Sequence, residues 1–214
     1  MKKRTCIFVC CAALIAFQSV SLAVIEPVTY SFYCVTDNNS TNAATGEAQL
    51  SMVVSNGGNQ VTFTFLNDAL GLPCVISEIY FDDGTLLEID HIVDNPPDVD
   101  FQHDKVTPKQ MPGSNLAIPE FVAVESFSLE PENPSPEHGV GPGEQVQVVF
   151  NLKGDGTVQD VLDELANGFL RIGMHVIAFG NCDGSESFVN IPEPTTIALL
   201  GLGMLVLIRK RRKA

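Results

Sequence analysis

Tryptophan is absent from this chain of 214 residues, and only three tyrosines accompany its 13 phenylalanines. Aromatic binding of a sugar ring favours tryptophan or tyrosine, whose flat rings have a polar edge. Tyr30 and Tyr33 fall in one predicted strand, where packing within a sheet is the default role. The composition therefore gives little support for an aromatic sugar-binding platform.

Basic residues are scarce outside the two ends of the chain. Residues 24–194 hold 26 acidic side chains against four basic ones, a formal net charge of −22. Such a surface repels nucleic-acid phosphates and anionic lipid, so we expect no nucleic-acid partner. It would attract divalent cations and basic partners. The four basic residues are Lys105, Lys109, Lys153 and Arg171.

Cysteine is also scarce once residues 1–23 are set aside, because only Cys34, Cys74 and Cys182 remain. Three cysteines allow one intramolecular disulfide, and three pairings are open. The pair Cys34–Cys74 is slightly favoured because both residues lie in the strand-rich N-terminal half. No CxxC spacing or neighbouring histidine supports zinc binding or thiol redox chemistry.

Motifs for catalysis are missing. The chain contains no HExxH, no GxSxG nucleophile turn, no P-loop and no GxGxxG after a strand. The sequence therefore predicts a protein that is not an enzyme, and a secreted polysaccharide hydrolase is the weaker alternative. Its four histidines are scattered: His91, His103, His138 and His175.

An acidic stretch between residues 94 and 104 is the one candidate for a metal site. Calcium takes six to eight oxygen ligands, which flexible Asp and Asn loops can supply. The spacing is not that of an EF-hand, so a solvated acidic loop is the expected structure and Ca²⁺ the alternative. The acids are Asp94, Asp98, Asp100 and Asp104, with Asp82 and Asp83 upstream.

The N-terminus has the pattern of a secretory signal peptide. Residues 1–4 supply a positive region, residues 6–20 an apolar one, and Ser21-Leu22-Ala23 a cleavage site of small residues. We therefore predict a signal peptide over residues 1–23. An uncleaved anchor is the alternative, although the apolar stretch is shorter than the ~20 residues of a spanning helix.

Most of the remaining chain alternates with period two, as half-buried strands do. Asn56-Gly57-Gly58-Asn59 and Asp82-Asp83-Gly84 have the composition of hairpin turns. Proline-rich stretches at residues 94–119 and 130–143 predict long surface loops. The predicted strands are 28–35, 47–54, 60–66, 75–81, 85–89, 121–129, 145–152, 169–179 and 185–190.

One helix is predicted after residue 156. Thr157 and Asp160 have the spacing of a capping box, apolar residues follow at helical spacing, and Asn167-Gly168 ends the helix. We therefore expect an all-β fold over residues 24–190: a single β-sandwich, jelly-roll-like or Ig-like, with one short crossover helix. A signal helix precedes it and a transmembrane helix follows.

The C-terminal tail, residues 191–214, combines an apolar run with a basic cluster. Residues 197–208 would span ~18 Å as a helix, and residues 195 and 196 with a snorkelling Arg209 extend this toward membrane length. The basic residues 209–213 would stay cytoplasmic, which leaves the acidic domain outside. A buried core helix, the alternative, does not explain five consecutive basic residues.

This tail resembles the PEP-CTERM sorting signal of exported bacterial proteins, because Pro192-Glu193-Pro194 precedes the apolar run and the Arg-rich end. The resemblance implies that a membrane exosortase recognises the signal and cleaves near it. The implied recognition residues are Pro192, Glu193, Pro194, Arg209, Arg211 and Arg212. Residues 80–89, 139–152 and 168–190 are also similar to uncharacterised PEP-CTERM proteins, which implies no activity for the body.

From these features we expect an exported, non-enzymatic protein of a Gram-negative bacterium. The tail would hold it transiently in the inner membrane before exosortase releases it to the cell surface or extracellular matrix. Adhesion, or association with biofilm exopolysaccharide, is the expected role. A carbohydrate-binding or calcium-binding module is the main alternative.

Overall fold

The computed structural model describes residues 25–69, 72–82, 85–95, 98–103, 110–124, 128–180 and 184–192. Ten strands lie in these ranges: β1 (Val28–Cys34), β2 (Leu50–Asn56), β3 (Gln60–Asn67), β4 (Val75–Asp82), β5 (Leu87–Asn95), β6 (Phe101–His103), β7 (Leu129–Pro131), β8 (Gln145–Leu152), β9 (Arg171–Phe179) and β10 (Gly184–Asn190). The helices are α1 (Ser40–Gln49), α2 (Ser135–His138) and α3 (Val158–Asn167), with a 3-10 turn, η1, at Ser114–Leu116.

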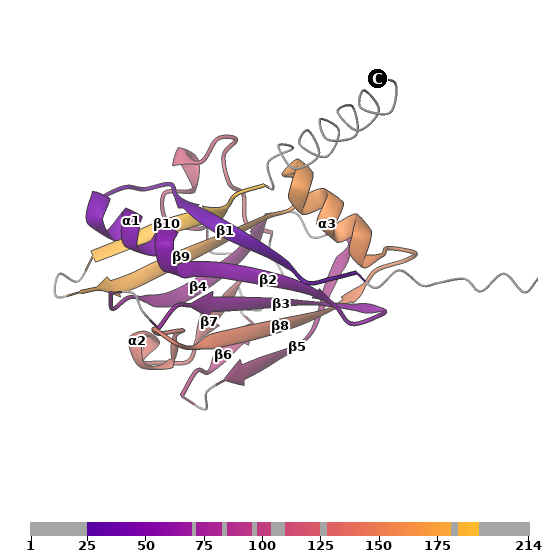
Figure 1. Cartoon of the computed structure of the whole chain (residues 1–214), viewed down its shortest axis with the longest axis horizontal. Coiled ribbons are helices and arrows are strands. Elements are labelled where there is room, and N and C mark those ends of the chain that lie inside the picture. The colour runs from indigo at the N-terminus through magenta and orange to yellow at the C-terminus, as the bar shows by residue number, and fades with distance from the viewer. Residues whose placement is uncertain are drawn as a thin grey trace, which may run out of the picture.

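All ten strands belong to one sheet, in the order β5-β8-β3-β2-β1-β10-β9-β4-β7-β6, and all neighbours are antiparallel (Figure 1). Strand β1 joins its two halves. Residues Val28–Ser31 pair with β2, whereas Phe32–Cys34 pair with β10. The all-β prediction is confirmed. The predicted sandwich, jelly-roll-like or Ig-like, is not, because β1 makes the two halves continuous.

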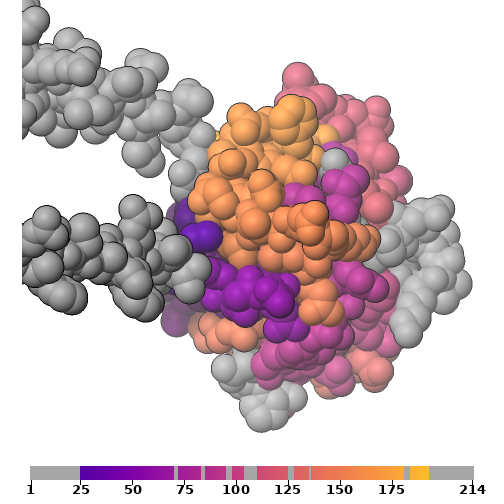
Figure 2. Space-filling model, turned by 90° about the vertical axis from the view of Figure 1, so that its right-hand side faces the viewer, coloured from indigo at the N-terminus to yellow at the C-terminus, as the bar shows by residue number. Residues whose placement is uncertain are grey.

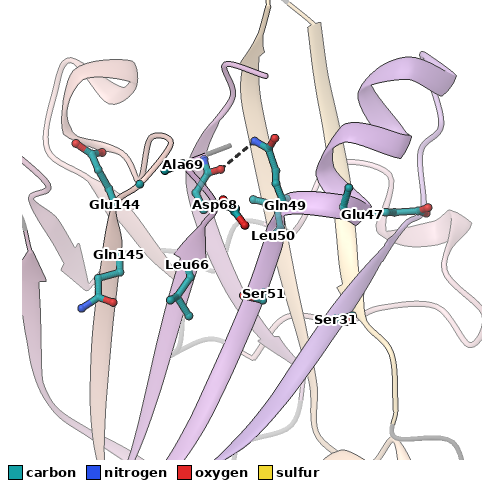
Figure 3. A pocket seen from close by; sticks show the side chains of 13 residues that line it. Ser31, Glu47, Gln49, Leu50, Ser51, Leu66, Asp68, Ala69, Glu144 and Gln145 are labelled. Atoms are coloured by element: carbon teal, nitrogen blue, oxygen red, sulfur yellow. Dashed lines mark hydrogen bonds between the residues drawn. The ribbon is translucent and has the colours of Figure 1, made fainter. Parts of the chain in front are cut away.

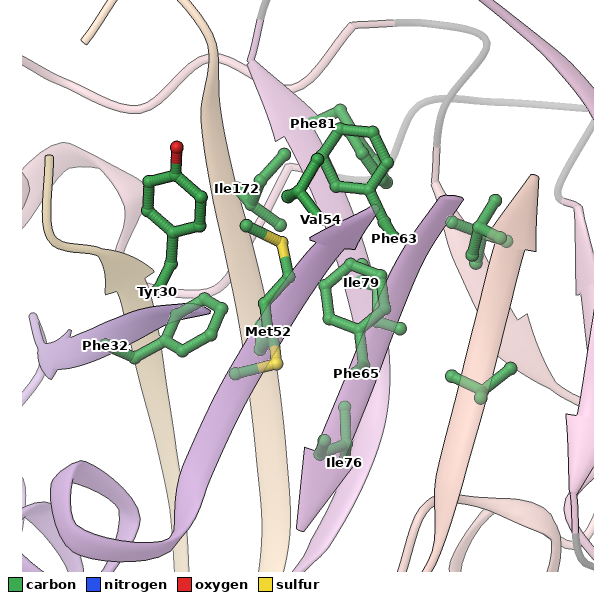
Figure 4. Close-up of a cluster of buried hydrophobic side chains, with 14 of the residues drawn as sticks. Tyr30, Phe32, Met52, Val54, Phe63, Phe65, Ile76, Ile79, Phe81 and Ile172 are labelled. Atoms are coloured by element: carbon green, nitrogen blue, oxygen red, sulfur yellow. The ribbon is translucent and has the colours of Figure 1, made fainter. Parts of the chain in front are cut away.

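Side chains from both halves meet in one core (Figure 4). Phe63 and Phe65 of β3 are fully buried, and the neighbouring Thr62 and Thr64 are not, which is the alternation of a half-buried strand. The Phe63 ring lies edge-on to Phe150 of the neighbouring β8 at 5.4 Å and to Phe81 of β4 at 5.6 Å. Since β4 belongs to the other half, this contact crosses the interior and holds the halves together.

Helix α3 confirms the one helix that was predicted. The Thr157 hydroxyl accepts from the Asp160 N–H while the Asp160 carboxylate accepts from the Thr157 N–H, and Gly168 ends the helix at φ 72°. Its buried face is Val158, Val161, Leu162 and Leu165. The helix connects β8 to β9, as expected, and lies on the side of the molecule that faces the viewer in Figure 2 (orange).

The predicted strand 47–54 is wrong at its start, because residues 47–49 belong to helix α1. Strand β2 begins only at Leu50. The Asn39 side chain caps the helix by accepting from two backbone N–H groups. In the middle of α1, a Cβ built on Gly46 would lie 2.2 Å from the Phe188 ring. A glycine that disfavours an isolated helix is therefore required for this one to pack on β10.

The turn predictions have two outcomes. The hairpin at residues 56–59 is confirmed, since it joins the paired strands β2 and β3 and Gly58 has φ 84°. The hairpin at 82–84 is wrong, because β4 pairs with β7 and β9 whereas β5 pairs with β8. The connection passes from one half of the sheet to the other.

The proline-rich stretches are less exposed than predicted. Residues 110–124 pack on the outer face of the sheet and form a second, smaller core there. In this core Met111 and Phe121 pack with Tyr80 and Val189. Gly173 makes room for them, since a Cβ there would lie 2.6 Å from Met111 Sδ. Strands β6 and β7, η1 and α2 also fall in these stretches. The predicted strand 121–129 is wrong in its described residues, 121–124 and 128–129, because only Leu129 belongs to a strand.

The two predicted membrane-directed segments, residues 1–23 and 197–208, lie outside the described residues. In the described part of the chain, no helix is both long and apolar enough to cross a membrane.

Candidate functional site

The tail leaves the domain directly from a central strand. Asn190 at the end of β10 is fully buried, and its Oδ1 accepts from Ile172 N–H at 2.7 Å. The next residue is also fixed, because Ile191 N–H donates to Ser31 O at 2.9 Å. Pro192 is exposed beside Gly168. Of the six predicted recognition residues only Pro192 is described; Glu193, Pro194, Arg209, Arg211 and Arg212 lie outside the described residues.

Exposed apolar side chains lie near this exit point. Phe169 is 70 % exposed and Ile118 is 92 % exposed. Phe169 points outward because the N–H groups of residues 169 and 170 both donate to Glu164 O, which turns the chain so that Leu170 enters the core. We define the exit face by three exposed apolar residues: Ile118, Phe169 and Ile191. Ile118 precedes Pro119, whose carbonyl binds Arg171, and Phe169 lies next to Gly168, which is beside Pro192.

Arg171 holds the exit face together. Its guanidinium pairs with the Asp82 carboxylate and donates to Pro119 O and Glu120 O, both at 2.6 Å. The same group lies 5.4 Å from the centre of the Phe121 ring. Residues from β9 and from the segment 110–124 are thereby fixed side by side. Arg171 is 8 % exposed, so its charge is satisfied within the protein.

A polar hollow of about 580 Å³ lies where α1, β2, β3 and β8 come together (Figure 3). Three carboxylates line it: Glu47 of α1, Asp68 just after β3 and Glu144 just before β8. Gln145 and the hydroxyls of Ser31 and Ser51 add further hydrogen-bonding groups. The Glu47 and Glu144 carboxylates already accept from the backbone N–H groups of residues 34 and 141. The arrangement can bind a neutral ligand with many hydroxyl groups.

Neutral amides and a thiol form the floor of the polar hollow. Gln49 Nε2 donates to Asn67 Oδ1 at 2.9 Å and to Cys74 Sγ at 2.8 Å. Asn67 Nδ2 donates to Cys74 O at 2.8 Å and Val140 O at 3.0 Å. Both amide side chains are buried. This network fixes the ends of β2, β3 and β4 around the hollow.

The favoured disulfide is not formed, because Cys34 and Cys74 are both free thiols. Cys74 binds the amides below the hollow, whereas Cys34 Sγ lies 3.6 Å from the buried Glu186 carboxylate. Burial raises the pKa of Cys74 to about 11 and also raises the pKa of Cys34. Neither thiol has the lowered pKa of a nucleophile. Cys182 lies outside the described residues.

Ser77, His175 and Glu78 form the group that most resembles a catalytic triad. The Glu78 carboxylate lies 3.1 Å from His175 Nδ1, and Ser77 Oγ lies 3.5 Å from the same nitrogen. In a catalytic triad the serine hydroxyl and the carboxylate contact opposite ring nitrogens of the histidine, whereas here both lie at Nδ1. Ser77 also donates to His175 O, so its hydroxyl supports the sheet rather than proton transfer.

The acidic stretch 94–104 does not assemble into a metal site in its described part. Asp94 is exposed and accepts from Phe101 N–H at 2.9 Å, and partial desolvation raises its pKa. In the ranges that the structure describes, no three His, Cys, Asp or Glu side chains are grouped to hold a metal ion. Asp83 and Asp104 lie outside the described residues.

Comparison with known families identifies the C-terminal tail. A family model, the PEP-CTERM protein-sorting motif, matches residues 190–213. The chain carries a PEP-CTERM sorting motif. No curated protein and no solved structure matches the chain.

The PEP-CTERM motif indicates an extracellular protein that an exosortase sorts, after transient attachment to the membrane. Its match begins at the last residue of β10, so the motif follows the folded domain without an intervening linker. The resemblance predicted from Pro192 onward is thus confirmed, whereas the roles of the individual recognition residues remain predictions.

Sequence reasoning missed the polar hollow and the role of Arg171. The hollow joins residues that are far apart in the chain, and no local pattern connects them. Arg171 offered one signal: it is one of only four basic residues in an acidic body, and it follows a predicted helix end. A lone arginine entering an apolar strand predicts a buried partner for its charge.

Proposed function

We propose that this chain is a non-enzymatic protein of the Gram-negative cell surface or extracellular matrix, sorted by exosortase and acting in adhesion or exopolysaccharide association. The sorting motif at residues 190–213 is the observation that carries the proposal. The excess of acidic residues over basic ones in residues 24–194 supports it, because divalent cations can bridge such a surface to anionic matrix polymers.

A carbohydrate-binding module is the second candidate, and the polar hollow favours it. Its carboxylate, amide and hydroxyl groups come from five elements and the loops beside them, and the buried network beneath holds several of these elements in place. Hydroxyl groups of a neutral sugar would donate to the carboxylates and accept from the amides. Recognition of this kind uses hydrogen bonds in place of the missing tryptophan. A calcium-binding module and a secreted hydrolase rank below it.

The test uses the mature protein isolated from the culture medium and the exopolysaccharide of the same host. Co-sedimentation gives the affinity, and the release of reducing ends reports hydrolysis. Ala48→Phe places a ring at the polar hollow, whereas Ala44→Phe places the same ring one turn earlier on α1. Ala44 does not line the polar hollow; it lines an adjoining one, which Ala48 also borders. Both positions are exposed, so neither substitution disturbs the core.

We expect saturable binding, no reducing ends, and about tenfold weaker binding for Ala48→Phe alone, a loss of about 1.4 kcal/mol. Equal binding by both variants would show that the hollow is not the binding site. Association through the acidic surface would then be the explanation of the binding. In that case chelation of calcium should abolish binding. Absence of binding under every condition would contradict the proposed association, and reducing ends would contradict the non-enzymatic role.

A further inference from the structure

The short connection between the sheet and the apolar run limits how far the domain can lie from the membrane. Ile191 is hydrogen-bonded to β1, and the apolar run begins at Ile197. Even fully extended, the five residues from Pro192 to Thr196 span at most about 17 Å. The headgroup layer takes up roughly 5–8 Å of this length. While the tail is inserted, the end of β10 must therefore lie within about 10 Å of the lipid headgroups.

The exit face lies at this end of the domain. Its residues come from three separate parts of the chain, which two contacts bring together: Arg171 binds the carbonyls of residues 119 and 120, and Asn190 binds Ile172 N–H. Single exposed apolar side chains are common on protein surfaces. A group of three, Ile118, Phe169 and Ile191, near the point where a membrane-directed tail leaves indicates a shared contact.

We propose that the exit face rests on the lipid surface of the membrane while the C-terminal tail is attached. Phe169 and Ile118 are the most exposed members and enter the headgroup boundary, as apolar side chains of interfacial segments do. Glu120 is exposed between Ile118 and Val122, and the whole body is acidic. The favoured surface is therefore zwitterionic lipid, because anionic lipid repels these charges.

The absence of tryptophan gives a direct test, because one introduced tryptophan reports its own surroundings. Phe169→Trp and Ile118→Trp mark the exit face. Leu72→Trp is the matched control: Leu72 is 54 % exposed but lies by the far end of β9, a strand roughly 30 Å long. Each chain is produced in a host without exosortase, so that the tail is retained, and is placed in phosphatidylcholine vesicles with or without brominated acyl chains.

In the vesicle-bound fraction, we expect brominated lipid to reduce the emission of the Phe169→Trp and Ile118→Trp variants by about twofold and to leave the emission of Leu72→Trp unchanged. Adding phosphatidylglycerol should weaken the quenching. Equal quenching in all three variants, or none in Phe169→Trp and Ile118→Trp, would overturn the proposal. Thermal unfolding of each variant confirms that the exposed substitutions leave the fold intact.

Contact with exosortase itself is the competing explanation. In that case Phe169→Ser would slow cleavage in the native host, while the emission of Phe169→Trp and Ile118→Trp would stay unquenched in vesicles. That combination would also overturn the proposal.

Discussion

The exit face and the polar hollow are two surfaces of the same sheet with opposite chemistry. The exit face exposes aliphatic and aromatic side chains, and Ile118 is 92 % exposed. The hollow is lined mainly by carboxylates, amides and hydroxyls. The apolar residues gather where the tail leaves, and the polar groups gather around α1. This contrast is what a domain needs if it meets lipid during sorting and hydrated polymer afterwards.

The two surfaces also differ in what supports them. A single buried guanidinium fixes the segment 110–124 beneath the exit face. Two neutral amides and a thiol support the hollow. Substitutions at the two sets of supporting residues should therefore change the free energy of unfolding by different amounts and with different pH dependence.

The largest effect is expected from Arg171→Met, which breaks the support of the exit face. The substitution leaves the Asp82 carboxylate and two carbonyl groups without their partner, at a cost of about 3 to 5 kcal/mol in the free energy of unfolding. Urea denaturation measures it. The control Lys153→Met removes an exposed charge and should change stability by less than about 0.5 kcal/mol. Equal effects would show that Arg171 has no special structural role.

The second largest effect is expected from Asn67→Ala, which removes the central amide of the hydrogen-bond network below the hollow. The carbonyls of Cys74 and Val140 and the Gln49 amide each lose one hydrogen bond in a buried site, so we expect a loss of about 2 to 3 kcal/mol by the same measurement. Val140 O keeps its bond from Ile76 N–H, and Gln49 keeps its bond to Leu72 O. Asn151→Ala serves as the control, because Asn151 makes its hydrogen bonds in a more exposed part of β8 and should cost below about 1 kcal/mol. A smaller loss for Asn67→Ala than for the control would contradict the role of the network.

Cys74, in the network below the hollow, should make the stability of the protein depend on pH. Its pKa in the fold is about 11 against 9.0 for an ordinary cysteine. Between these values the unfolded chain loses the thiol proton and the folded chain keeps it, so stability is full below pH 9 and falls as pH rises toward 11. The expected difference at pH 10.5 is about 2 kcal/mol. Cys74→Ala should lose less stability over this range in parallel urea titrations; identical slopes would refute the effect.

The smallest effect concerns the helix that leads to Phe169. Thr157→Ala removes the cap of α3 and should cost about 1 kcal/mol. Hydrogen bonds from Thr157 lower the pKa of Asp160, so the difference between wild type and variant should shrink as pH falls through that lowered pKa. Gln159→Ala, in the same helical turn, is the control. Acid titration that leaves the difference unchanged would contradict the capping-box account.

The sequence could predict those parts of the fold that depend on residues close together in the chain. The capping residues Thr157 and Asp160 and the stop at Gly168 lie within one short stretch, and α3 follows them. The alternation in β3 and β8 is equally local, and both strands were predicted nearly to the residue. The sorting motif is also contiguous, which explains why it was recognised.

Features that depend on distant partners could not be predicted. Helix α1 contains a glycine, and it packs because that glycine fits against Phe188, which lies in β10. The segment 110–124 has the composition of a loop but is buried through Arg171 and Gly173, far along the chain. The continuity of the sheet depends on β1 changing partners midway. Period-two patterning cannot distinguish that arrangement from two separate sheets.

Intact mass of the protein from the native host, measured in the cell envelope and in the medium, tests the central claim most directly. The comparison is with a variant that carries Pro192→Ala and Glu193→Ala. Sorting by exosortase predicts a mature wild-type species that begins near Val24 and lacks Arg209 to Ala214, while the variant keeps its tail. A wild-type protein that retains Arg209 to Ala214 in every fraction would contradict the account and make the tail a permanent part of the molecule.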